Sequence, residues 1–126
     1  MTKCILVVED QEDLRAILRD LLTASGYTVI EGVDGVEGVA KARSEHPDLV
    51  LMDIQLPVLD GYDATRQIRA LPGLEAIPII AVSSFAMKGD EEKARASGCD
   101  GYVTKPYSPV QLLRLIQKYL GEKMQS

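Results

Sequence analysis

Short apolar runs alternate with amphipathic stretches along the whole chain. The runs are Cys4–Val8, Tyr27–Ile30, Leu49–Met52, Ile77–Val82 and Tyr102–Val103. Several are rich in β-branched residues and almost continuously apolar, which is typical of strands covered on both faces. The runs therefore predict five buried strands.

A segment with helical periodicity follows each run. Leucine and isoleucine recur at i, i+3 and i+4 spacing from Leu14 to Leu22, and Gly26 ends that helix. The other four helices are predicted to start at Asp34, Asp60–Gly61, Asp90 and Ser108–Pro109, and Glu37 stands at capping-box spacing from Asp34. The helix from Asp60 is predicted to end before Pro72, the helix from Asp90 at Gly98, and the helix from Ser108 at Gly121. The alternation predicts an α/β fold, a doubly wound (βα)₅ domain with a five-stranded parallel sheet and right-handed crossovers.

Composition narrows the class of protein. The 126 residues suffice for one domain, expected over residues 1–126, with 46% hydrophobic and 26% charged residues. Nineteen acidic against 14 basic residues give a net charge of −5, which argues against a nucleic-acid-binding surface. No apolar segment is long enough to cross a bilayer. Cys4 and Cys99 are too few for a disulfide framework, and we expect small buried thiols in a reducing cytoplasm.

Residues whose side chains could take part in binding or catalysis follow four of the predicted strands. Glu9–Asp10 follow the first, Asp53 the third, Ser83–Ser84 the fourth and Thr104–Lys105–Pro106 the fifth. Ligands of parallel α/β sheets gather where loops leave the carboxyl ends of the strands. These groups are therefore expected to converge at one edge of the sheet.

Three converging carboxylates repel one another, and burial would raise their pKa values. A hard divalent cation removes this problem, and Mg²⁺ prefers oxygen ligands, often carboxylates together with phosphate oxygens. With the ion bound, Asp53 can stay ionised and act as a nucleophile, while Lys105 and Ser83 hold phosphoryl oxygens. The predicted product is an acyl phosphate on Asp53.

Each of these residues also has a purely structural interpretation. Asp10 could cap the first helix, Asp53 could cap a turn, Ser83–Ser84 could form a turn, and Lys105 could be a solvated loop charge. Individually each signal is weak. Four independent strand ends with matching chemistry favour a shared site over coincidence.

Four motifs in order carry a resemblance to a known family: VVED at 7–10, LMDIQLPVLDG at 51–61, PIIAVSS at 78–84 and GYVTKP at 101–106. Together they resemble the receiver domains of two-component response regulators over essentially the whole chain. The chain is similar to single-domain regulators of chemotaxis and the cell cycle. The stretch SFAMKGDEEKARASGCDGY in particular looks like single-domain regulators of the cell-cycle or phytochrome-associated kind. The resemblance implies a flavodoxin-like receiver fold and a phosphorylation-dependent switch in signal transduction.

The resemblance assigns roles to the converging residues. Asp53 matches the phosphoacceptor, and Lys105 matches the family's lysine. Glu9, Asp10, Asp53 and the backbone carbonyl of Gln55 match the site for Mg²⁺, for which Mn²⁺ could substitute. In that pattern Asp10 binds the ion directly and Glu9 binds it largely through water.

Further residues match the switch and the loops around it. Ser83, in place of the commoner threonine, matches the hydroxyl that swings toward the phosphoryl group, and Tyr102 matches the aromatic side chain that turns inward with it. Ser84 stands where Ala or Gly is usual, and its backbone N–H is expected to contact phosphate. Gln55 and Phe85 occupy positions that tune dephosphorylation. Residues that match structural positions are Pro57, Asp60, Gly61 and, after a cis peptide bond, Pro106.

The resemblance also implies partners. A sensor histidine kinase or a histidine phosphotransfer protein would supply the phosphoryl group, and the chain would catalyse only its own phosphorylation and dephosphorylation. No effector domain is expected after Gly121, so output would pass to a downstream protein through the fourth helix, fifth strand and fifth helix. Direct nucleic-acid binding and membrane insertion are not expected.

The last helix has a wide apolar stripe. Leu113 or Leu115 could be stray exposed residues, or could meet a partner or a second copy in a homodimer.

Three other function classes make different predictions. A flavodoxin-like electron carrier needs a Ser/Thr/Gly-rich phosphate loop, whereas Glu-Asp-Gln-Glu stands at 9–12, and the chain has no Trp. A haloacid-dehalogenase-type phosphatase places its nucleophile in a D-x-D pattern after the first strand, which is absent here. A degenerate receiver acting as a pure binding module would lack an active-site group, and none is missing.

Overall fold

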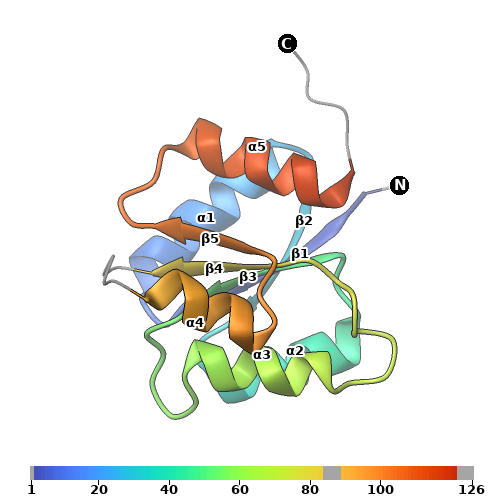
Figure 1. Ribbon diagram of the computed structural model, residues 1–126. Coiled ribbons are helices and arrows are strands. Elements are labelled where there is room, and N and C mark those ends of the chain that lie inside the picture. The colour runs from blue at the N-terminus through green and yellow to red at the C-terminus, as the bar shows by residue number, and fades with distance from the viewer. Residues whose placement is uncertain (1, 84–88, 122–126) are drawn as a thin grey trace.

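The computed structural model describes residues 2–83 and 89–121 and shows one parallel sheet between two layers of helices (Figure 1). Its elements are β1 (Cys4–Val8), α1 (Glu12–Ala24), β2 (Thr28–Gly32), α2 (Gly35–Glu45), β3 (Leu49–Asp53), α3 (Gly61–Arg69), β4 (Ile79–Ser83), α4 (Asp90–Ser97), β5 (Gly101–Thr104) and α5 (Pro109–Leu120). The strand order is β2-β1-β3-β4-β5. The predicted doubly wound (βα)₅ sheet is confirmed.

Both faces of the sheet are covered, which explains the uninterrupted apolar runs. In β1, Ile5 and Val7 pack with α1 and α5, while Leu6 and Val8 pack with α2, α3 and α4. Figure 1 shows the same division, with α1 and α5 on one side of the sheet and the other three helices opposite. Because successive side chains of a strand point to opposite faces, each position needs an apolar residue.

Helix starts agree with the predicted caps at three places. The side chains of Asp34, Asp60 and Ser108 each accept a hydrogen bond from the backbone N–H three residues further on. The start of α1 differs, because its N-cap is Gln11, whose side chain makes no capping hydrogen bond. The structural interpretation of Asp10 as a helix cap is therefore wrong, and its carboxylate is left for another role.

Two strands, β2 and β4, start later than predicted. Tyr27 lies before β2, because its N–H donates to the carbonyl of Leu22 in the turn that ends α1. Ile77 and Pro78 lie before β4; proline has no N–H for a ladder, and the carbonyl of Ile77 accepts a hydrogen bond from Arg69. Hydrophobicity predicts that these residues are covered, and the structure shows Tyr27 buried and Ile77 and Pro78 partly buried. It does not reveal where their backbone groups form hydrogen bonds.

The apolar stripe of α5 is largely used within the molecule. Leu112 and Ile116 are buried, and Leu113 and Leu115 are partly buried against the same core. The exposed large apolar residue of this helix is Val110, at 55%. Leu113 and Leu115 are therefore not stray exposed leucines. No helix in the described ranges has the length and apolar character needed to cross a membrane.

Candidate functional site

The register of the central strands brings three carboxylates together. Val8 pairs with Met52, so the residues that follow them, Glu9 and Asp53, leave neighbouring strands side by side, and Asp10 comes next. One carboxylate oxygen of each of the three lies within 4.8 Å of the others. Glu9 and Asp53 are only 2% and 4% exposed, whereas Asp10 is exposed to solvent. The predicted convergence at this edge is present in the fold.

Lys105 completes this cluster from the end of β5. Its Nζ donates to Oε1 of Glu9 at 2.8 Å and to Oδ2 of Asp53 at 3.3 Å. The backbone holds it in place, because the N–H of Lys105 donates to the carbonyl of Ser83 at 2.7 Å and continues the β4–β5 pairing. The side chain is 15% exposed, so Lys105 is not a solvated loop charge.

The pKa values of the cluster reflect its crowding. Burial lowers the pKa of Lys105, but the hydrogen bond to Glu9 and the charges of Asp53 and Glu9 raise it more, so the net shift is upward. Partial desolvation raises the pKa of Asp10, and the adjacent Glu9 carboxyl raises it further. The cluster therefore keeps its lysine charged and disfavours the charge on its outermost carboxyl.

The donor set suits a hard divalent cation. Three carboxylates against one ammonium leave two negative charges, and the carboxylate oxygens are close enough to share one ion. Asp10 lies on the solvent side, where a cation can enter and keep part of its water shell. Such oxygen ligands with room for water are what Mg²⁺ prefers.

The loop from β3 to α3 lies beside the carboxylate cluster and holds Asp53 in place. Oδ1 of Asp53 accepts the N–H of Gln55 at 2.9 Å, so one oxygen stabilises the turn while the other faces Lys105. The predicted turn-capping role of Asp53 thus coexists with its place in the cluster. At Gly61, a Cβ would lie 2.3 Å from the carbonyl oxygen of Asp53, so only glycine lets α3 approach β3 this closely. Asp60 caps the same helix, and Pro57 lies earlier in the loop.

The predicted switch residues lie on β4 and β5. Ser83 is fully buried, and its Oγ accepts a hydrogen bond from Nε2 of Gln55 at 3.1 Å. Tyr102 pairs with Ala81 and packs against the core on the α4 side. Its hydroxyl is buried and has no hydrogen-bond partner within residues 2–83 and 89–121. Ser84 and Phe85 lie outside the described residues, as does the phosphate contact predicted for Ser84.

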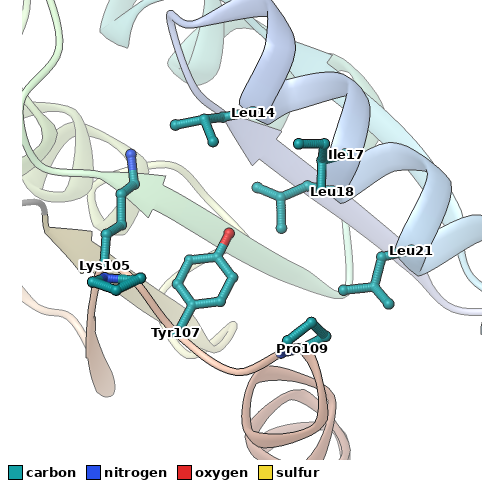
Figure 2. A pocket seen from close by; sticks show the side chains of 8 residues that line it. Leu14, Ile17, Leu18, Leu21, Lys105, Tyr107 and Pro109 are labelled. Atoms are coloured by element: carbon teal, nitrogen blue, oxygen red, sulfur yellow. The ribbon is translucent and has the colours of Figure 1, made fainter.

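An apolar pocket of about 380 Å³ adjoins Lys105 (Figure 2). Leu18 and Leu21 of α1 face Tyr107 and Pro109 across it. Its complete lining is Leu14, Ile17, Leu18, Leu21, Lys105, Pro106, Tyr107 and Pro109. Ile17 at its rim is 62% exposed, a large exposed apolar side chain beside a polar site. Burial raises the pKa of the Tyr107 hydroxyl above its ordinary value.

Most of the predicted site residues meet in the fold. Glu9, Asp10, Asp53 and Lys105 form one cluster, and Ser83 is linked to it through Gln55. The peptide bond before Pro106 is cis, as the resemblance implied. Sequence reasoning missed the side-chain contact of Gln55 and the role of Arg15, whose Nη1 donates to the carbonyl of Glu9 at 3.0 Å. An arginine on the polar side of a helix gives no signal of such a contact.

Comparisons with known proteins show what this chain is similar to. Residues 5–117 match the family model described as the response regulator receiver domain. The polar-differentiation response regulator DivK of Brucella ovis is 47% identical over 122 residues, which cover 97% of this chain and 99% of the relative.

Solved structures show the same fold. The receiver domain of the sensor histidine kinase PA1611 from Pseudomonas aeruginosa, which carries a magnesium ion in its active-site cleft, superposes with a TM-score of 0.90 at 38% identity. That match covers 97% of this chain and 100% of the other. The chemotaxis protein CheY4 of Vibrio cholerae gives a TM-score of 0.90 at 26% identity, covering 94% and 99% of the two chains.

Proposed function

Because this chain belongs to the response-regulator receiver family, we propose that it is a phosphorylation-dependent switch whose phosphoacceptor is Asp53. The observation that carries the proposal is the cluster at the sheet edge. Three carboxylates lie within 4.8 Å of one another, and Lys105 contacts two of them. Phosphoryl transfer requires mainly positioning and neutralisation of charge, and this cluster offers both.

Mg²⁺ is the proposed cofactor, and Mn²⁺ could replace it. Asp10, Asp53 and the backbone carbonyl of Gln55 would hold the ion directly, with Glu9 acting largely through water. The bound ion would neutralise charge on the transferred phosphoryl group. Support comes from the donor set itself and from the related P. aeruginosa receiver domain, which was crystallised with magnesium in its cleft.

The residues of the chain would divide the reaction between them. A carboxylate oxygen of Asp53 attacks the phosphorus, a new P–O bond forms, and the P–N bond of a phosphohistidine donor breaks. Lys105 and Ser83 then hold oxygens of the phosphoryl group. The chain would catalyse only this reaction and the hydrolysis of its own acyl phosphate.

Two partners follow from this chemistry. The donor would be a sensor histidine kinase or a histidine phosphotransfer protein in the cytoplasm. We propose that it docks on the apolar pocket between α1 and Tyr107, because Lys105 lines that pocket and also contacts Asp53. A downstream protein would read the face of α4, β5 and α5, where rearrangement of Ser83 and Tyr102 would alter the surface.

Phosphorylation by acetyl phosphate tests the proposal without a protein partner. With Mg²⁺ present, the wild-type chain should gain one phosphoryl group, and Asp53→Asn should gain none. Asp13→Asn, an exposed acid on the first turn of α1, is the matched control and should be labelled normally. Removal of Mg²⁺ with a chelator should also abolish labelling. Equal labelling of Asp53→Asn and the wild type would refute the assignment.

A further inference from the structure

Arg15 ties the acidic cluster to the neighbouring strand. It lies near the start of α1, and its side chain is only 16% exposed. Nη1 donates to the backbone carbonyl of Glu9 at 3.0 Å, and Nε donates to Oε1 of Glu31 on β2 at 3.1 Å. The planar guanidinium thus bridges the β1–α1 turn and β2, a two-point contact that arginine makes and lysine cannot reproduce.

Glu9 is held at each of its polar groups. Its N–H donates to the carbonyl of Gly32 at 3.0 Å. Its carboxylate accepts from Lys105 at 2.8 Å and from the N–H of Gln11 at 3.1 Å. The contact from Arg15 fixes the remaining group, the carbonyl oxygen. The backbone that leads from Glu9 into Asp10 is therefore fixed on both sides of Glu9.

The carbonyl contact has a direct consequence for Asp10. The carbonyl of Glu9 and the N–H of Asp10 belong to one planar peptide unit, so holding the oxygen sets the direction in which the Asp10 Cα leaves the strand. Asp10 makes no helix cap, and its carboxylate is exposed. Its position near Glu9 and Asp53 therefore depends on the backbone more than on side-chain packing.

We infer that Arg15 is a positioning residue of the magnesium site, which holds the Glu9–Asp10 peptide so that the Asp10 carboxylate faces Asp53. The inference rests on the proposed function. Arg15 does not touch the reacting atoms; it acts through the backbone of Glu9. Groups outside the ligands of a metal site that orient those ligands commonly change metal affinity by 10- to 100-fold when removed.

Arg19 offers a matched control on the same helix. Its Nη1 pairs with Oε2 of the same Glu31 at 3.3 Å, and its other ion pair is with Asp20 at 3.8 Å. Replacing Arg19 removes a positive charge and an ion pair to Glu31 but leaves the carbonyl contact to Glu9 intact. The pair Arg15→Met and Arg19→Met therefore separates the carbonyl contact from the ion pairs with Glu31.

The test is a Mg²⁺ titration of the full chain in which binding is monitored by amide NMR, with no phosphodonor present. Arg15→Met should bind Mg²⁺ on the order of tenfold more weakly than the wild type, and Arg19→Met should bind with wild-type affinity. Arg15→Lys should show a smaller loss than Arg15→Met. Its single amine can keep one of the two contacts of Arg15 but cannot reach both partners. In labelling by acetyl phosphate, Arg15→Met should need more Mg²⁺ but recover at saturating Mg²⁺, which general destabilisation would not produce.

The possible outcomes are distinct. Wild-type affinity in Arg15→Met, or an equal loss in Arg19→Met, would overturn the inference. Should Arg15→Met fail to fold, Arg15→Lys becomes the deciding variant. A wild-type affinity of Arg15→Lys for Mg²⁺ would then overturn the positioning role of Arg15. Absence of Mg²⁺ binding by the wild type would instead overturn the proposed function, before any variant is compared.

Discussion

The Nζ atom of Lys105 lies 2.8 Å from Oε1 of Glu9, although 96 residues separate the two in the sequence. The same atom reaches Oδ2 of Asp53 at 3.3 Å. One ammonium group therefore forms ion pairs with two buried carboxylates from two different strands. The stability of the fold and the charge balance of the site thus depend on the same contact.

Lys105→Met should lower the free energy of unfolding by on the order of 3 kcal/mol, because it leaves two buried carboxylates without their counter-charge. Mg²⁺ should restore part of the loss by supplying positive charge. Urea unfolding with and without Mg²⁺ measures both effects. Lys118→Met, on an exposed position of α5, is the control and should change little. Equal stability of the two variants without Mg²⁺ would contradict this account of the cluster.

The pH dependence of the same contact has a definite sign. The pKa of Lys105 is raised overall: burial lowers it, but the hydrogen bond to Glu9 and the two carboxylate charges outweigh that effect. Its stabilisation is therefore fully present below the ordinary lysine pKa of about 10.4 and is lost as the pH rises through the higher folded value. The stability difference between wild type and Lys105→Met should stay constant near neutral pH and shrink only above about pH 10. A difference that shrinks near neutral pH would contradict this sign.

Ile17→Glu should impair transfer from a protein donor without affecting labelling by acetyl phosphate. Ile17 is 62% exposed at the rim of the apolar pocket, and a charge there would remain unpaired in an apolar interface. A loss of about tenfold in the transfer rate at limiting donor concentration is expected. Val36→Glu, at a 54% exposed position on α2, is the matched control. Equal transfer rates in the two variants would place the donor elsewhere.

The fold could be predicted from the sequence because buried parallel strands leave an unmistakable pattern. The runs at Cys4–Val8 and Leu49–Met52 nearly coincide with β1 and β3, since both faces of these central strands are covered. The ends were less predictable. The polar Glu12 and Asp13 form the first turn of α1, where apolar periodicity gives no signal.

The sequence was enough to predict which residues meet in the site, because the carboxyl ends of parallel strands lie at one edge of the sheet. The sequence does not contain the individual bonds. That Lys105 bridges Glu9 and Asp53, or that Gln55 donates to Ser83, depends on side-chain conformation within the assembled loops. The contact from Arg15 to the backbone carbonyl of Glu9 was missed because a carbonyl is present at every residue and leaves no mark in the sequence.

Val58→Gly should stabilise the protein by about 1 kcal/mol. Val58 has a φ of 69°, in a turn closed by the N–H of Leu59 and the carbonyl of Pro57, and its side chain is 84% exposed. A β-branched residue is strained there, and little packing would be lost with it. Thermal unfolding measures the effect, and Val33→Gly, an exposed valine without a positive φ, should destabilise. A loss of stability in Val58→Gly would show that the turn is not strained.

The most direct test of the account is to locate the phosphorylated residue. The chain is labelled with acetyl phosphate and Mg²⁺, and borohydride then reduces the acyl phosphate, so that the modified aspartate becomes homoserine and can be found by tandem mass spectrometry. We expect homoserine at position 53 alone and none when Mg²⁺ is chelated. Homoserine at another acidic residue, or at position 53 without any divalent ion, would contradict the account.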